Sequence, residues 1–157
     1  MSAVTVALMM FMGGCSNDAP TADSSNRGSG TDTEDTSVEN AFIVPAYVPG
    51  SCAMQVDAGG VMRFTVTNNR PADTERLLGL TVSAAEASIP ARADIPPKST
   101  VGFGEPNVGD ARNPAVRLEQ LDPDLRPAMS ADVTFHFERS GDLTMPVPVE
   151  ACPVQAP

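Results

Sequence analysis

Short runs of alternating apolar and polar residues, interrupted by Gly and Pro, fill the chain from Val38 onward and constrain its fold more than any other feature. Within Val61 to Asn68, the apolar side chains of Met62, Phe64 and Val66 share one face and polar residues occupy the other. A period of two is that of a half-buried β-strand, because successive side chains point to opposite faces. No segment shows sustained helical periodicity. The pattern predicts an all-β protein, a sandwich or a barrel.

The same pattern recurs along the chain and predicts about seven or eight strands around one core, as suits a chain of 157 residues. The predicted strands are Val38–Val44, Val61–Asn68, Leu77–Ser83, Ser88–Ile95, Thr100–Gly104, Ala115–Leu121, Ala131–Glu138 and Asp142–Val149.

The last two predicted strands form a hairpin. Ser140-Gly141 supplies a tight turn between them. Pro146 and Pro148 cannot donate a hydrogen bond to a neighbouring strand, so we expect the final strand at a sheet edge. The predicted inward residues are Val133, Phe135 and Phe137 on one strand and Leu143, Met145, Val147 and Val149 on the other.

Cys15 closes an apolar run, Ala3 to Met12, and precedes a long polar tract. The run has the length of a signal-peptide core and is too short for a helix across a bilayer core of about 30 Å. Met12-Gly13-Gly14-Cys15 is similar to a lipobox, the cleavage and lipidation site of bacterial lipoproteins. The alternative is a buried N-terminal strand or helix.

Lipidation at Cys15 predicts four segments. Residues 1–14 are a signal peptide and residues 15–37 are the lipidated Cys with a disordered acidic spacer, which is rich in Ser, Thr, Asp and Gly. Residues 38–152 are the β-sandwich domain, and residues 153–157 are a C-terminal tail. We expect the domain to lie outside the cytoplasm, anchored to the cytoplasmic membrane.

Cys52 and Cys152 form an even pair once Cys15 is assigned to lipid. In an oxidising compartment such a pair predicts a disulfide, which would join the two ends of the domain. The alternative is a two-thiolate metal site, but no second pair of Cys or His flanks either residue at zinc-ligand spacing.

Charge and motifs exclude several functions. Ten Lys and Arg against twenty Asp and Glu give a net charge of −10, which argues against binding to nucleic acid. The chain has no Gly-x-Ser-x-Gly, no His-Glu-x-x-His and no phosphate-binding Gly-rich loop. We therefore expect no enzymatic activity and no resident cofactor.

His136 and two methionines are the remaining candidates for a metal site. The neighbours of His136 place it on the solvent face of a strand, where an ordinary exposed histidine is the first interpretation. Met62 and Met145 fall on inward faces and are best read as core residues. Met54 and Met129 are better placed for exposure, and thioethers bind Cu(I). A copper site of Met54, Met129 and His136 is the alternative.

The order of segments resembles the LpqE-like lipoproteins of actinobacteria, which are similar to the PCu(A)C periplasmic copper chaperones. The resemblance rests on Gly60-Val61-Met62-Arg63-Phe64-Thr65-Val66-Thr67-Asn68, on Arg76-Leu77-Leu78-Gly79-Leu80-Thr81-Val82-Ser83 and on Thr134-Phe135-His136-Phe137-Glu138. It implies an immunoglobulin-like, cupredoxin-related β-sandwich.

The resemblance also implies where copper would bind. The family holds Cu(I) with a His that aligns near Ser88 to Pro90, an upstream Met, and a His-x-Met pair that aligns with Ala115 and Arg117. None of these residues is a copper ligand, and Arg117 would place a cation at the metal position. We therefore expect an envelope lipoprotein with a non-enzymatic binding or accessory module. We expect its partner to be an envelope protein or a small ligand. The alternative is a copper chaperone with a relocated site.

Overall fold

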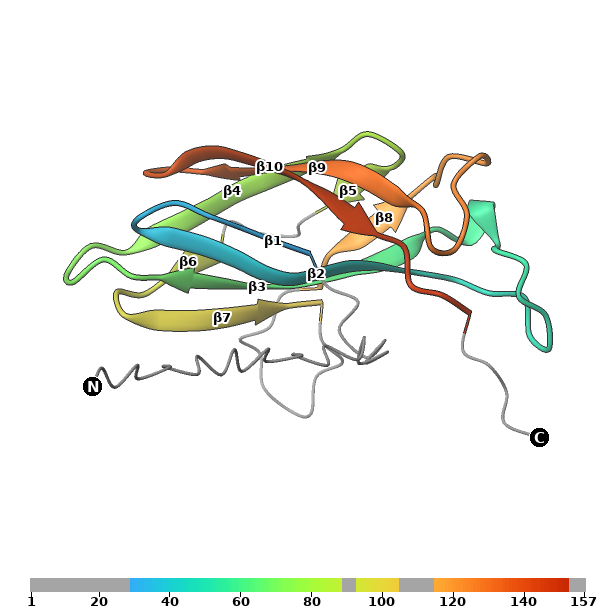
Figure 1. Ribbon diagram of the computed structural model, residues 1–157, viewed down its shortest axis with the longest axis horizontal. Helices are drawn as coiled ribbons and strands as arrows, with labels where there is room; N and C mark the ends of the chain where they lie inside the picture. The colour runs from blue at the N-terminus through green and yellow to red at the C-terminus, as the bar shows by residue number, and fades with distance from the viewer. Residues whose placement is uncertain (1–28, 89–92, 105–114, 153–157) are drawn as a thin grey trace, which may run out of the picture.

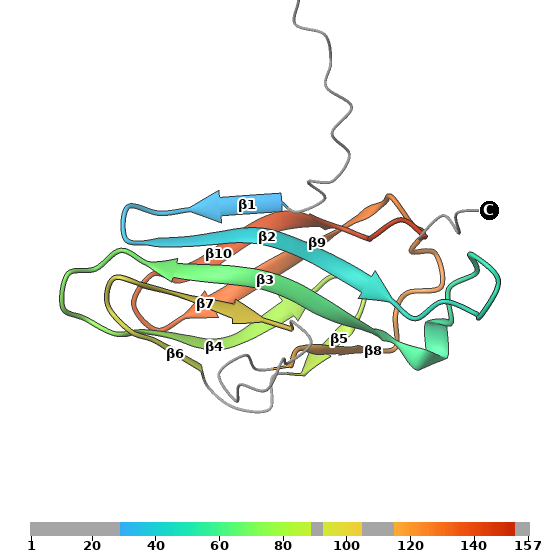
Figure 2. The same cartoon turned by 90° about the horizontal axis from the view of Figure 1, so that it is seen from below.

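The computed structural model describes residues 29–88, 93–104 and 115–152, which are almost entirely β-strand (Figure 1). The strands form two antiparallel sheets that face each other as a sandwich, as the view from below also shows (Figure 2). This confirms the predicted fold class. Nowhere in the described residues is there a helix long and apolar enough to cross a membrane.

The larger sheet has six strands. Their order is β1 (Ser29–Asp32), β2 (Thr36–Pro45), β3 (Gly60–Asn68), β8 (Arg117–Glu119) and β5 (Glu86–Ser88), and β7 (Ser99–Phe103) also pairs with β3. A short 3-10 turn, η1 (Val56–Ala58), precedes β3. The smaller sheet has four strands, in the order β10 (Gly141–Pro148), β9 (Ser130–Phe137), β4 (Glu75–Val82) and β6 (Ala93–Ile95).

Three phenylalanines join the two sheets in the core. Phe64 of β3 stacks on Phe103 of β7, with ring centroids 4.6 Å apart, and meets Phe135 of β9 edge-on at 5.0 Å. Such pairs add to the free energy gained from burying their apolar area. The inward positions predicted for β3 are buried, because Met62, Phe64 and Val66 are at most 2% exposed.

The predicted hairpin is confirmed. β9 and β10 pair along their whole length, and Gly141 adopts the positive φ of 73° that the turn requires. All seven predicted inward residues are buried. β10 lies at the edge of its sheet, as Pro146 and Pro148 indicated.

The expected boundary of the domain was wrong. Residues expected to belong to a disordered spacer form β1, and β2 begins at Thr36 instead of Val38. β1 is polar because it pairs with β2 through its backbone at the sheet edge, so it needs no apolar face. Cys15, the signal peptide and the C-terminal tail at 153–157 lie outside the described residues.

The strand predicted at Ser88–Ile95 was also wrong, because two strands in different sheets take its place. β5 belongs to the larger sheet and β6 to the smaller one. Pro90 lies between them in the sequence, and a Pro disfavours a continuous strand because it has no N–H to donate.

Candidate functional site

The corner formed by β5 and β8 is the first candidate site. The two strands lie side by side (Figure 2), with Ser88 as the register partner of Arg117 and Glu86 as the partner of Glu119. β8 is fixed from its other side by β3, where Val61 pairs with Arg117. The structure thus brings together two of the segments on which the family resemblance placed copper ligands.

The side chains of the corner do not fit Cu(I). Arg117 and Ala115 are exposed, while Leu118 between Arg117 and Glu119 is buried in the core. Cu(I) prefers thioether, thiolate and imidazole ligands, and a guanidinium has no lone pair to donate. Ser88, Ala115 and Arg117 offer none of the preferred groups. The copper site implied by the family resemblance is therefore chemically absent from this corner.

An open groove next to the corner is acidic. It is lined by Asp57 after β2, by Glu86 of β5 and by Asp122 in the loop after β8. The backbone N–H of Asp122 donates to the carbonyl of Ala84 at 2.7 Å, and this bond holds the loop against the β4–β5 turn. Since Glu119 lies opposite Glu86, the negative charges repel one another here. The groove favours cationic groups over anionic ones.

Gly59 allows the chain to pass close to β8. It has a positive φ of 66°, and a Cβ atom at this position would lie 2.0 Å from the carbonyl oxygen of Leu118. Only Gly fits such a close approach of two backbones. The sequence Gly59-Gly60 is thus required where the larger sheet turns into the corner.

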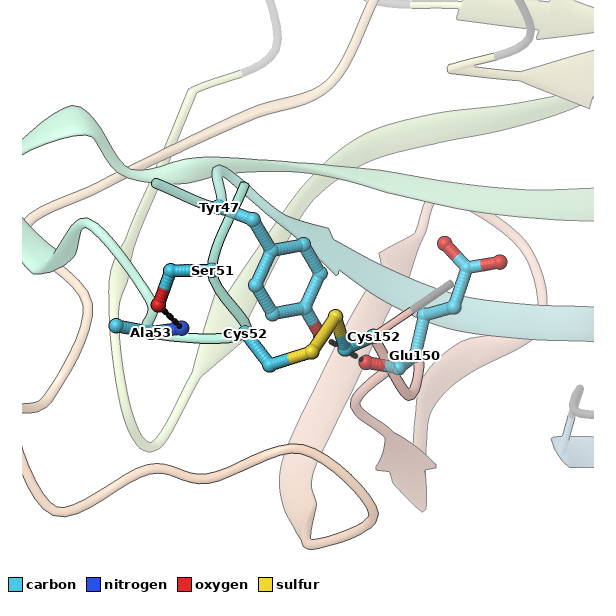
Figure 3. Close-up of a disulfide and its surroundings, with 6 residues drawn as sticks. All are labelled: Tyr47, Ser51, Cys52, Ala53, Glu150 and Cys152. Carbon is cyan, nitrogen blue, oxygen red and sulfur yellow. Dashed lines mark hydrogen bonds between the residues drawn. A yellow bond between two sulfur atoms is a disulfide. The ribbon is translucent and has the colours of Figure 1, made fainter. Parts of the chain in front are cut away.

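The disulfide joins the β2–β3 loop to the segment after β10 (Figure 3). Cys52 and Cys152 have Cα atoms 5.4 Å apart and are 100 positions apart in the sequence, as predicted. Beside them the Tyr47 hydroxyl donates to the carbonyl oxygen of Glu150 at 2.5 Å. Burial, and then the carboxylate of Glu150, raise the pKa of Tyr47. The two ends of the domain are therefore held by a covalent bond and a hydrogen bond.

The three residues of the alternative copper site do not come together. Met54 forms an isolated β-bridge with Tyr47 and packs against the core. Met129 is 47% exposed, and its backbone carbonyl accepts a hydrogen bond from the N–H of Val149. Both lie at the disulfide end. His136 lies six residues after Ser130, the first residue of β9, and six residues span about 20 Å at the rise of an extended strand. The expected grouping of His136 with the two methionines was therefore wrong.

His136 is held by two hydrogen bonds on the outer face of the smaller sheet. Its Nε2 bonds to the hydroxyl of Thr81 at 2.9 Å, and its Nδ1 bonds to Asp142 at 2.8 Å. The sequence pattern placed His136 on this face correctly. It did not indicate the partners, because they come from β4 and β10.

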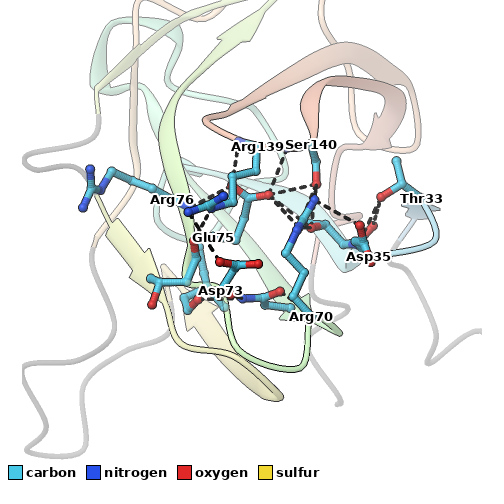
Figure 4. Close-up of polar contacts among 12 residues, drawn as sticks. Thr33, Asp35, Arg70, Asp73, Glu75, Arg76, Arg139 and Ser140 are labelled. Atoms are coloured by element: carbon cyan, nitrogen blue, oxygen red, sulfur yellow. Dashed lines mark hydrogen bonds and ion pairs between the residues drawn. The ribbon is translucent and has the colours of Figure 1, made fainter.

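A buried polar cluster closes the end of the sandwich away from the disulfide (Figure 4). Glu75 is fully buried, and its carboxylate accepts the backbone N–H groups of Arg76 and Arg139 and both donors of Ser140. Arg70 contacts the same carboxylate at 3.0 Å and Asp35 at 3.2 Å. Every oxygen of the buried carboxylate thus has partners, which a buried charge requires.

Burial on its own would raise the pKa of Glu75. The hydrogen bonds from Arg76, Arg139 and Ser140 outweigh it and hold the pKa below its ordinary value. Sequence reasoning missed this cluster. Its only signal is a charged residue at an inward position, Glu75, two before Leu77 on the same strand.

Comparisons with known proteins support the fold. The chain matches no protein-family model, and no curated protein matches it. Among solved structures it is similar to the apo PCuAC domain of PmoF1, with a TM-score of 0.61 and 16% identity over 79% of this chain and all of that one.

Two further structures are similar to a comparable degree. The copper-bound PCuAC domain of PmoF2 has a TM-score of 0.56 and 20% identity over 79% of this chain and 99% of that one. The apo PCuAC domain of PmoF2 has a TM-score of 0.56 and 19% identity over 78% of this chain and 95% of that one. The chain therefore has the cupredoxin-like sandwich fold of the PCuAC domains.

Proposed function

We propose that this chain is a cell-envelope lipoprotein whose β-sandwich is a non-enzymatic binding or accessory module. Its anchor is a lipid on Cys15 in the cytoplasmic membrane, and its sandwich lies outside the cytoplasm. The observation that carries the proposal is the Cys52–Cys152 disulfide. Structural disulfides persist in oxidising compartments and are rare in the cytoplasm. The lipobox-like sequence before Cys15 supports the same location.

The binding surface in this proposal is the β5–β8 corner with its acidic groove. The corner has the place of the copper site in the family resemblance, but it carries Arg117 and two glutamates in place of soft ligands. A fold does not fix the ligand, because function depends on the residues of the site. The module therefore binds a ligand or partner other than Cu(I) there.

Mass spectrometry of the protein from its own cells tests the anchor. We expect a mature chain that begins at Cys15 and carries acyl chains. The matched variant Cys15→Ser should stay uncleaved. It should also be bound to the membrane less strongly than the native chain. An uncleaved native chain with a free thiol at Cys15 would contradict the anchor and the location together.

Crosslinking in intact membranes tests the corner. Arg117→Glu and Glu86→Lys reverse charges on the two strands of the corner, and both side chains are exposed, so the fold should be kept. Glu138→Lys is the control, because Glu138 is also exposed but directly follows β9 in the other sheet. We expect the crosslinked product of the native protein to be lost in the first two variants only. Its persistence in both would contradict a partner at the corner.

Copper handling is the second candidate, and the likeness to a domain that is described as copper-bound favours it. Its remaining ligands are Met54 and Met129 at the disulfide end. Titration with Cu(I) in competition with a chelator tests it, using Met54→Ala and Met129→Ala. Because reduced Cys52 and Cys152 would themselves bind Cu(I), the titration is repeated in a chain with both cysteines and Cys15 changed to Ser. One-to-one binding that either Met variant abolishes would favour copper handling over the first proposal.

A further inference from the structure

Three polar side chains on the outer face of the smaller sheet form one hydrogen-bonded chain. Asp142 of β10, His136 of β9 and Thr81 of β4 lie on three adjacent strands. Asp142 Oδ1 and His136 Nδ1 are 2.8 Å apart, and His136 Nε2 and Thr81 Oγ1 are 2.9 Å apart. None of these residues belongs to the corner or to the disulfide end.

When the imidazole of His136 is neutral, its partners determine the direction of both bonds. An ionised carboxylate only accepts hydrogen bonds, so the neutral ring of His136 carries its proton on Nδ1, toward Asp142. The Nε2 atom then has a lone pair and accepts the hydroxyl proton of Thr81. A carboxylate that orients an imidazole, which in turn accepts from a hydroxyl, is the arrangement that activates a nucleophilic oxygen.

The space beside the imidazole is open. Gly79 is the register partner of His136, and a Cβ atom on Gly79 would meet nothing within 4 Å. A bulge between Leu77 and Gly79 leaves Leu78 as an apolar side chain that is 42% exposed. Bulges are frequent next to reactive sites because they redirect side chains. An acyl group can thus approach Thr81 from solvent without displacing a side chain at position 79.

We propose that Thr81 is an acyl-acceptor site, modified by an activated acyl ester or thioester. The Thr81 oxygen forms a bond to the acyl carbonyl carbon, and the bond from that carbon to the alcohol or thiol of the donor breaks. The Thr81 proton passes to His136 Nε2 and from there to the departing alkoxide or thiolate. No oxidant or other reactant is needed. Asp142 is a positioning residue, since it acts on the hydroxyl only through the imidazole.

The same sheet face contains a matched control. Thr134 is the register partner of Thr81 and lies on the neighbouring strand, but its hydroxyl bonds to the hydroxyl of Thr144 at 2.8 Å. It therefore lacks a base. A positioned base typically accelerates proton transfer about 10²- to 10⁴-fold. The Thr81 site is exposed, so we expect less than this full acceleration. Thr81 should be acylated at least about tenfold faster than Thr134.

The experiment treats the full chain with p-nitrophenyl acetate and measures acetylation of each Thr by peptide mass spectrometry. The native protein should gain a stable acetyl group at Thr81, which Thr81→Val abolishes and Thr134→Val leaves unchanged. His136→Gly should slow labelling of Thr81 to the rate at Thr134, and added imidazole should restore it. Asp142→Asn should slow it as well, and Asp142→Glu, which keeps the carboxylate, should recover part of the rate.

Circular dichroism and thermal unfolding of each variant verify the fold, which these surface changes should keep. Equal labelling of Thr81 and Thr134 in the native protein would overturn the proposal. So would labelling of Thr81 that does not change in His136→Gly, or the absence of an acetyl group at Thr81 while Lys98 is acetylated. These outcomes are independent of the anchor and of the β5–β8 corner.

Discussion

The Oε2 atom of Glu75 accepts hydrogen bonds from both the backbone N–H and the hydroxyl of Ser140, at 3.0 and 2.8 Å. The two residues are 65 positions apart, so one buried carboxylate connects the start of β4 to the β9–β10 turn. Thr36 at the start of β2 bonds to Ser140 as well, at 2.7 Å. The cluster thus joins both sheets at the end of the sandwich that has no disulfide.

Glu75→Gln should destabilise the protein by about 1–3 kcal/mol. The amide places an NH₂ group among donors and leaves Arg70 without its buried carboxylate partner. Glu138→Gln is the control, because Glu138 is exposed and its ion pair with Arg76 at 3.5 Å lies at the surface, where such pairs contribute roughly 0–1 kcal/mol. Urea unfolding measures both. Equal loss of stability in the two variants would contradict a structural role for the cluster.

The stability that Glu75 provides should disappear in acid. Its pKa is lower in the folded protein than its ordinary value, so the folded state binds the proton less tightly than the unfolded state. The contribution is therefore complete above the unfolded pKa of about 4.3 and is lost as the pH falls through the folded pKa. The difference in urea midpoint between native protein and Glu75→Gln should shrink between pH 6 and pH 3. A difference that stays constant over this range would contradict the lowered pKa.

The strands that were predictable are those with a long apolar alternation. β3, β9 and β10 each bury one face, so apolar and polar residues alternate in their sequences with a period of two. β1 was missed because an edge strand that pairs through its backbone needs no apolar face. β5 and β6 were merged because three-residue strands are too short to show a period of their own.

The candidate sites were predictable only in part. Cysteine counting found the Cys52–Cys152 disulfide, and the family resemblance located Ser88 and Arg117, which are register partners. The partners of His136 and the buried state of Glu75 depend on which strands become neighbours. The pairing of strands that are distant in the sequence depends on the whole sheet, so a local sequence pattern does not predict it.

Loss of the disulfide should lower stability by about 2–5 kcal/mol, since it closes a loop of 100 residues. The variant carries Cys52→Ser and Cys152→Ser, and thermal unfolding measures the loss. A reductant should lower the melting temperature of the native protein and leave that of the variant unchanged. An equal response of both proteins to reductant would show that the effect does not come from this bond.

Gly59→Ala should disrupt the pairing of β3 with β8. The new Cβ atom would lie 2.0 Å from the Leu118 carbonyl oxygen, so one of the two backbones has to move. Gly50→Ala is the control, because Gly50 has a similar φ of 73° but open space around it, so only the cost of the left-handed conformation, about 1–2 kcal/mol, applies. Amide hydrogen exchange should show faster exchange at Leu118 in Gly59→Ala only. Unchanged exchange there would contradict the close approach.

Restoring soft ligands to the β5–β8 corner should create a Cu(I) site. Ser88→His, Ala115→His and Arg117→Met together supply two imidazoles and a thioether, and the register already places positions 88 and 117 opposite each other. We expect at least about tenfold tighter binding of Cu(I) than in the native protein, measured by chelator competition. Arg117→Met alone is the control, since it removes the cation but adds only one ligand. If the triple variant gains nothing over this control, the corner does not correspond to the copper position of the family, and Arg117 does not explain its loss.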